Sequence, residues 1–131
     1  MTKMFVSYRA DDEGTLYKNL LVAWSENSRF PELIFGDTSV GVSINSEDAD
    51  YIKQVIKKRI KKSDVVLCLV GKNTASSDWV NWEIKKAHEL DKKIVAVKIS
   101  SSYDSPIELL GIGAKWAMSF TKDSILDALD L

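Results

Sequence analysis

The sequence has little of what disulfide-linked, metal-binding and membrane-spanning proteins need. Its 131 residues include one cysteine and one histidine, which form neither an internal disulfide nor a metal-ligand cluster. No apolar run approaches the roughly 18 residues that cross a bilayer, and the opening MTKMFVSY is too short and too polar for a signal peptide. We therefore expect a cytoplasmic protein with no bound metal, no bound cofactor and no membrane partner.

An excess of charge of one sign is also missing. Eighteen basic residues face 19 acidic ones, so the net charge of -1 gives no general reason to expect nucleic acid as a partner. The densest basic run is KKRIKK at 57–62. It falls at the end of a predicted helix whose first turn is acidic, a polarity that complements the helix dipole. We interpret this run as a solvated helix end.

Short apolar runs and helical patterns alternate along the whole chain. The runs VVLCLVG and KIVAVKI are typical of strands that are buried on both faces of a parallel sheet, and the single cysteine, Cys68, lies inside the first. We expect Cys68 to be a core residue. The predicted strands are 4–8, 32–35, 65–71, 93–99 and 116–120. The predicted helices are 12–27, 47–62, 77–90, 106–110 and 123–129, with a loop at 36–46.

This alternation predicts one three-layer α/β domain over residues 1–131, with a flavodoxin-like, mainly parallel five-stranded sheet in the order 2-1-3-4-5. Such a sheet binds ligands at the carboxyl ends of its first and third strands, where the winding reverses. Residues 7–11 and 71–82 follow those two strands. In the first helix, helical spacing predicts an apolar face, formed by Leu16, Leu20, Ala23 and Trp24.

The third helix places a carboxylate at the edge of its apolar face. On a helical wheel Val80, Ile84 and Ala87 form the centre of the apolar arc. Glu83 falls on the flank of this arc, near Trp79. Trp82 projects to the polar face of the helix, and His88 projects to the far, surface side. Position alone leaves three interpretations of Glu83 open, namely a functional group, a side chain that snorkels to water, and a partner of a nearby cation.

Two segments resemble the signatures of TIR domains. SDWVNWE at 77–83 resembles the S-x-W-C-x-x-E motif, with valine in place of the usual cysteine, and FVSYRADD at 5–12 resembles the opening signature F-I-S-Y. The pattern W-V-x-[WY]-E-I-x-K-A, followed by a K-x-I-V-x-V strand, is similar to the TIR-like branch of bacterial Thoeris anti-phage systems. The resemblance covers nearly the whole chain and is strongest at 4–12 and 64–99.

The resemblance implies an enzyme that consumes NAD. Catalytic TIR domains cleave the bond between nicotinamide and ribose, and in the Thoeris branch the product is a cyclic or conjugated ADP-ribose signal that activates a separate effector after phage infection. The motif glutamate maps onto Glu83. The implied partners are NAD as substrate, the effector and further copies of the chain. Candidate substrate contacts are Ser7, Tyr8, Arg9, Asp37, Trp79 and Trp82.

Plainer interpretations stay open beside these roles. Trp79 is also a suitable core residue, Arg9 a suitable solvated loop charge, and Ser7 a hydrogen-bond donor to backbone at the strand end. The R-D-x-x-P-G loop of many TIR domains is absent from 36–46, and no G-x-G-x-x-G motif is present. Two rival functions also remain open: a non-catalytic interaction module, and an N-glycosidase related to nucleoside 2-deoxyribosyltransferases, which also use a glutamate in such a crevice.

Overall fold

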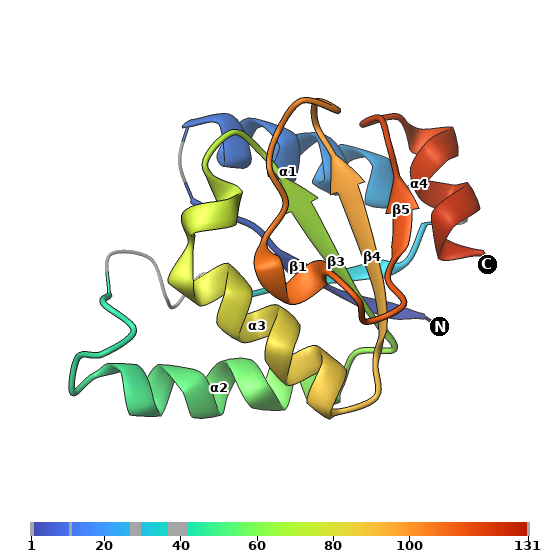
Figure 1. Cartoon of the computed structure of the whole chain (residues 1–131). Coiled ribbons are helices and arrows are strands. Elements are labelled where there is room, and N and C mark those ends of the chain that lie inside the picture. Colours follow the sequence, from blue (N-terminus) through green and yellow to red (C-terminus); the bar gives the residue numbers. More distant parts are fainter. Residues whose placement is uncertain (1, 11, 27–29, 37–41, 131) are drawn as a thin grey trace.

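Five parallel strands form the sheet at the centre of the structure, a computed structural model that describes residues 2–10, 12–26, 30–36 and 42–130. The strands are β1 (Lys3–Ser7), β2 (Glu32–Phe35), β3 (Val65–Val70), β4 (Lys93–Lys98) and β5 (Lys115–Ala117). Their order is β2-β1-β3-β4-β5, and every neighbouring pair is parallel. The predicted order is confirmed (Figure 1). The last strand is shorter than predicted and begins one residue earlier.

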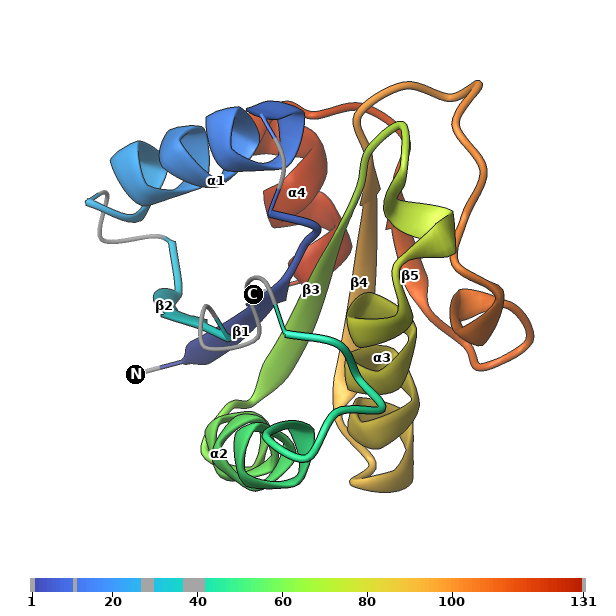
Figure 2. The ribbon, with the colours of Figure 1, turned by 90° about the vertical axis from the view of Figure 1, so that its left-hand side faces the viewer.

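Helices cover both faces of the sheet, which confirms the three-layer prediction. They are α1 (Asp12–Ser25), α2 (Ala49–Lys61), α3 (Asp78–Glu89) and α4 (Lys122–Leu129), with short 3-10 helices η2 (Thr74–Ser76) and η3 (Ile107–Leu109). Helices α1 and α4 lie on one face, and α2 and α3 on the other (Figure 2). The short helix predicted at 106–110 is η3. No helix of the described part is long and apolar enough to cross a membrane.

The core consists of two clusters, one on each face of the sheet. Strand β3 contributes to both because alternate side chains point to opposite faces. Val66, Cys68 and Val70 pack with α2 and α3, while Leu67 and Leu69 pack with α1 and α4. All six residues of β3 are buried, so the prediction that Cys68 is a core residue is confirmed.

The predicted apolar face of α1 is wrong in three of its four residues. Leu16 is 57% exposed and Leu20 is 39% exposed, and Ala23 is also exposed. Leu21 is instead a fully buried apolar side chain of this helix. A second stripe at helical spacing, Tyr17, Leu21 and Trp24, faces the sheet, because all three pack in the cluster that includes side chains of β1 and β3. The rings of Tyr17 and Trp24 also pack on Phe120, which follows β5. Two apolar stripes shared the same period, and contacts with the C-terminal segment decided between them.

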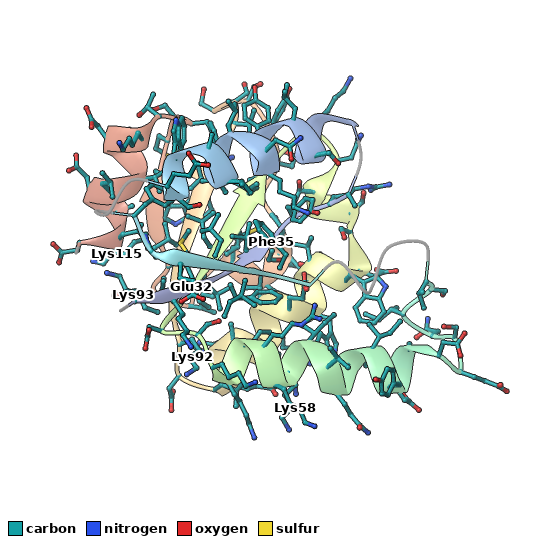
Figure 3. All side chains as sticks on the ribbon, turned by 180° about the vertical axis from the view of Figure 1, so that it is seen from behind. Glu32, Phe35, Lys58, Lys92, Lys93 and Lys115 are labelled. Carbon is teal, nitrogen blue, oxygen red and sulfur yellow. The ribbon has the colours of Figure 1, made fainter. Side chains whose placement is uncertain are left out.

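The basic run at 57–62 is a helix end, as predicted, with one exception. Its lysines are exposed, and Figure 3 shows Lys58 on the outer side of α2. Arg59 is half-buried, and its Nη1 donates to the backbone oxygen of Phe35 at 2.8 Å. This hydrogen bond ties the carboxyl end of β2 to α2.

Candidate functional site

A buried carboxylate lies at the carboxyl end of β1, where the ligand edge of the sheet is expected. Glu83 is in the second turn of α3, and its residue is only 3% exposed. It is buried together with Val80, Ile84 and Ala87, as the wheel predicts for the flank of the apolar arc. The carboxylate does not reach out to water, so the interpretation of Glu83 as a snorkelling side chain is wrong.

Ser7 is a direct partner of that carboxylate. It is the last residue of β1 and is fully buried. Strand alternation places Ser7 on the same face as Phe5, which packs with α2 and α3. Its Oγ donates to Glu83 Oε1 at 2.9 Å, across 76 positions of sequence. The alternative role, a hydrogen bond from this hydroxyl to the backbone, is not what its side chain does here.

Gly36 approaches the other carboxylate oxygen. It directly follows β2 and is buried. A Cβ on this residue would lie 2.8 Å from Glu83 Oε2 and 2.9 Å from Phe5 Cζ, both closer than real Cβ contacts. Its φ is outside the left-handed range, so close approach rather than backbone freedom requires the glycine. In the sequence Gly36 is only the first residue of the predicted loop at 36–46, although a glycine directly after a strand at the ligand edge is a signal that could have marked it.

Cys68 is close enough to the carboxylate for its thiol to feel the charge of Glu83. It pairs in register with Ser7 in the neighbouring strand. Burial, and secondly the negative charge of Glu83, raises the pKa of the Cys68 thiol far above its ordinary value. The thiol is therefore kept protonated and serves as a small apolar neighbour of the site.

The two tryptophans of the motif pack against the core cluster between the sheet, α2 and α3. Trp79 is half-buried, and its Nε1 donates to the backbone oxygen of Val42 at 2.6 Å. Trp82 meets it edge-on, with ring centroids 6.0 Å apart, and the Nζ of Lys86 lies 5.6 Å from the centre of the Trp82 ring. The prediction that Trp82 lies on the polar face is wrong, because Trp82 is half-buried against the same core cluster as Trp79.

The side chains of Tyr8 and Arg9 contact different parts of the structure. The ring of Tyr8 packs edge-on against Phe35 with centroids 6.2 Å apart, in the cluster beneath α1 and α4, on the sheet face opposite Glu83. Arg9 is exposed, and its Nη1 donates to Asn73 O at 3.0 Å and to Ser76 Oγ at 3.1 Å. Arg9 therefore connects the segment after β1 to the segment that leads into α3. Asp37 lies outside the described residues.

Asn81 is a structural contributor that sequence analysis missed. Its Nδ2 donates to the backbone oxygens of Ala75 and Ser77, and its Oδ1 accepts from Glu108 N at 3.3 Å. These contacts join α3 to η2 and η3. Ser77 caps α3 by accepting from Val80 N, which confirms the predicted helix start. His88 is exposed, as predicted. Among the described residues, no group of three His, Cys, Asp or Glu side chains is placed to hold a metal.

The fold and the site together define a class of protein. The chain is a flavodoxin-like α/β domain that carries a buried, hydrogen-bonded carboxylate at its switch point, where such sheets bind ligands. Residues 5–104 match the family model described as the TIR-like domain of the Thoeris protein ThsB, and the chain belongs to this family. The resemblance predicted from residues 5–12 and 77–83 is thereby confirmed.

Known proteins similar to this chain include one curated sequence and three solved structures. A putative cyclic ADP-D-ribose synthase, TIR2 of Cytobacillus dafuensis, is 28% identical over 67 residues; the match covers 51% of this chain and 18% of that protein. The 2-deoxyribosyltransferase of Bacillus psychrosaccharolyticus shares the fold with a TM-score of 0.67 and 12% identity, covering 88% of this chain and 85% of the other. The CMP N-glycosidase BcmB of Clostridium botulinum has a TM-score of 0.65 and 16% identity, and the match covers 99% of this chain and 100% of that chain. The TIR domains of the activated Roq1 resistosome have a TM-score of 0.51 and 23% identity, and the match covers 78% of this chain and 61% of that chain.

Proposed function

We propose that this chain cleaves the bond between nicotinamide and ribose in NAD, with Glu83 as the catalytic carboxylate. The observation that carries the proposal is the burial of Glu83 at the carboxyl end of β1, where Ser7 donates to its Oε1. Membership of the TIR-like family supports it, as does the name of the relative from Cytobacillus dafuensis, a putative cyclic ADP-D-ribose synthase.

The chemistry needs one well-placed carboxylate. When the C1′–N bond breaks, its electron pair leaves with the nicotinamide nitrogen, which changes from a pyridinium to a neutral ring. The ribose C1′ then carries oxocarbenium character, which a carboxylate stabilises, as in glycosidases. Because Glu83 is shielded from water, its charge acts more strongly on the transition state than an exposed carboxylate would. Water or a nucleophile from the ADP-ribosyl group itself completes the reaction at C1′.

The residues around Glu83 suggest how NAD is held. Arg9 lies over the segment that leads into α3, where its guanidinium suits a pyrophosphate. Trp82, which precedes Glu83 in α3, offers a flat ring on which a ring of NAD can stack. Asp37 is a further candidate contact, from the segment after β2. Tyr8 is a weaker candidate, because its ring contacts Phe35 on the opposite face of the sheet.

The finer biological role forms part of the same proposal. The product is a cyclic or conjugated ADP-ribose signal that is made in the cytoplasm after phage infection. That signal activates a separate effector, and copies of the chain associate to complete the active state. The matched segment covers only 18% of the curated relative, so this role is argued from the family and from the site chemistry.

The test compares two glutamates of the same helix. Cells that express the chain are infected with phage, and nicotinamide and ADP-ribose products are quantified by mass spectrometry. We expect Glu83→Gln to lose at least about 100-fold in nicotinamide release, as loss of a group that stabilises transition-state charge does. Glu89→Gln is the matched control, because Glu89 is exposed and pairs with Lys86 at 2.9 Å. A wild-type chain that releases no nicotinamide after infection, or a fully active Glu83→Gln variant, would refute the proposal.

The two rival functions predict different results in the same experiment. The bond to ribose C1′ in nucleosides and nucleotides is also N-glycosidic, and the fold matches a CMP N-glycosidase over 99% of this chain. An N-glycosidase of that kind would release base from nucleotides or deoxynucleosides while NAD stays intact. A non-catalytic interaction module would keep phage resistance in the Glu83→Gln variant, with no product detected from either substrate class.

A further inference from the structure

We propose that Ser7 and Gly36 are positioning residues that hold the Glu83 carboxylate in one orientation from two neighbouring strand ends. The inference rests on the proposed function of Glu83 and extends it to two residues that do not themselves touch the reacting bond. Ser7 acts through a hydrogen bond to Oε1, and Gly36 acts by leaving room for Oε2.

The hydrogen bond from Ser7 is well placed to orient a carboxylate. Both partners are buried, so water does not readily replace the hydroxyl if it is removed. A hydrogen bond to an ionised oxygen is roughly twice as strong as a hydrogen bond between two neutral groups. Ser7 is also rigidly held, because it ends β1 and pairs in register with Cys68 in β3. The position of Oε1 is therefore set by the sheet and not by α3 alone.

The backbone at Gly36 is held equally firmly. Phe35, which precedes it, pairs with Val6 in the sheet, and its carbonyl oxygen accepts from Arg59 Nη1 at 2.8 Å. Phe5, the second neighbour of a Cβ at position 36, is fully buried in the core and has no room to move away. A methyl group at position 36 would therefore press on both neighbours. It would displace the carboxylate of Glu83, the far end of a flexible side chain, and it would strain the packing against Phe5.

Displacement of the carboxylate should lower the rate, and the contact with Phe5 should also lower the stability of Gly36→Ala, so the Tm of each variant is measured beside its kcat. Moving a catalytic group by about 1 Å can cost on the order of 100-fold in rate. Loss of a hydrogen bond to a charged catalytic group should lower the rate about 10- to 100-fold. We therefore expect both substitutions to reduce the rate at saturating NAD, while binding of NAD, which uses other groups, changes little.

The first test replaces Ser7 and uses another buried serine as its control. Nicotinamide release is measured against NAD concentration in lysates of phage-infected cells that contain matched amounts of the chain. We expect Ser7→Ala to lower kcat about 10- to 100-fold with KM changed little, and Ser7→Thr, which keeps the hydroxyl, to recover most of the activity. Ser63→Ala should keep wild-type activity, because the Ser63 hydroxyl is buried far from the site and donates to Arg59 O.

The second test adds a methyl group beside Oε2. Gly36→Ala is expected to lower kcat by a similar factor, and the double variant with Ser7→Ala should lose less than the product of the two effects, because both act through one carboxylate. Gly113→Ala is the control. Gly113 has a φ of 78° with open space around it, so alanine there strains the backbone without approaching Glu83.

The outcomes separate this inference from the proposed function. If wild type and Glu83→Gln release the same amount of nicotinamide, the proposed function fails. If Glu83→Gln is inactive while Ser7→Ala and Gly36→Ala keep wild-type kcat, only the positioning role fails. A Ser7→Thr variant that melts like wild type but is as inactive as Ser7→Ala also overturns the role of the hydroxyl. Should Ser7→Ala not fold, Gly36→Ala and Ser7→Thr decide the question.

Discussion

Glu83 is a charged residue inside a core, and its surroundings explain how the fold accommodates it. Burial of an ionised carboxylate without hydrogen-bond donors is costly. Here the Ser7 hydroxyl donates to one oxygen, and the absence of a side chain at Gly36 leaves space for the other. A hydrophobic residue at position 83 would fill the same space at lower cost, so the retained charge is consistent with the catalytic role that we propose.

The Cys68 thiol gives a prediction about pH. Its folded-state pKa is raised by burial, so the folded state keeps the proton above the ordinary pKa of 9.0 while the unfolded state releases it. The free energy of unfolding should therefore fall as pH rises above about 9, by about 1.4 kcal/mol per pH unit from this group. Urea unfolding of wild type and Cys68→Ala at several alkaline pH values measures the difference in slope. If the free energy of unfolding falls equally steeply with pH in both proteins, the pKa of the Cys68 thiol is not raised in the folded state.

At the scale of elements, α1 shows which apolar residues stabilise the fold. Leu21→Ala should lower the free energy of unfolding by about 2 to 5 kcal/mol, because it removes a fully buried side chain from the cluster beneath α1. Leu20→Ala, the control in the same helix turn, should change it by less than about 0.5 kcal/mol, because Leu20 is partly exposed. Denaturant titrations of the two variants test this, and a larger loss for Leu20→Ala would mean that α1 packs through its other stripe.

Helix α3 is oriented by contacts at its first turns. Ser77 caps its first turn, Asn81 joins it to η2 and η3, and Trp79 donates to Val42 O. The Trp79 contact lies one turn before Glu83, on the same helix. These bonds hold the start of the helix against loops from three parts of the chain. The direction in which Glu83 leaves the helix therefore depends on a network that reaches well beyond the motif.

At the scale of the whole molecule, the strand order brings the site together. Strand β1 lies between β2 and β3 (Figures 1 and 2). Ser7, at the end of β1, and Gly36, directly after β2, therefore both meet Glu83 of α3. Arg9 connects the segment after β1 to the segment before α3 at this point. Lys92, Lys93 and Lys115 lie toward the opposite end of the sheet, where β4 and β5 begin (Figure 3).

This arrangement predicts that NAD stabilises the folded chain. In the Glu83→Gln variant the substrate stays intact, so NAD at about 100 times its Kd should add about 2.7 kcal/mol to the free energy of unfolding. Thermal unfolding with and without NAD would show this as a rise in Tm of several degrees. CMP and deoxynucleosides serve as comparison ligands. A rise with these ligands and none with NAD would favour the N-glycosidase alternative.

The sequence by itself determined the features that depend on neighbouring residues. Apolar runs and helical periods predicted the strand order and the layers, and the wheel of the helix predicted at 77–90 placed Glu83 at the edge of the core. The tertiary structure decided which stripe of α1 is buried, that Ser7 binds Glu83, and that Gly36 leaves room for its second oxygen. Those contacts join residues far apart in the sequence, such as Ser7 and Glu83 at 76 positions, or Tyr17 and Phe120. Periodicity carries no information about such pairs, because it describes one element at a time.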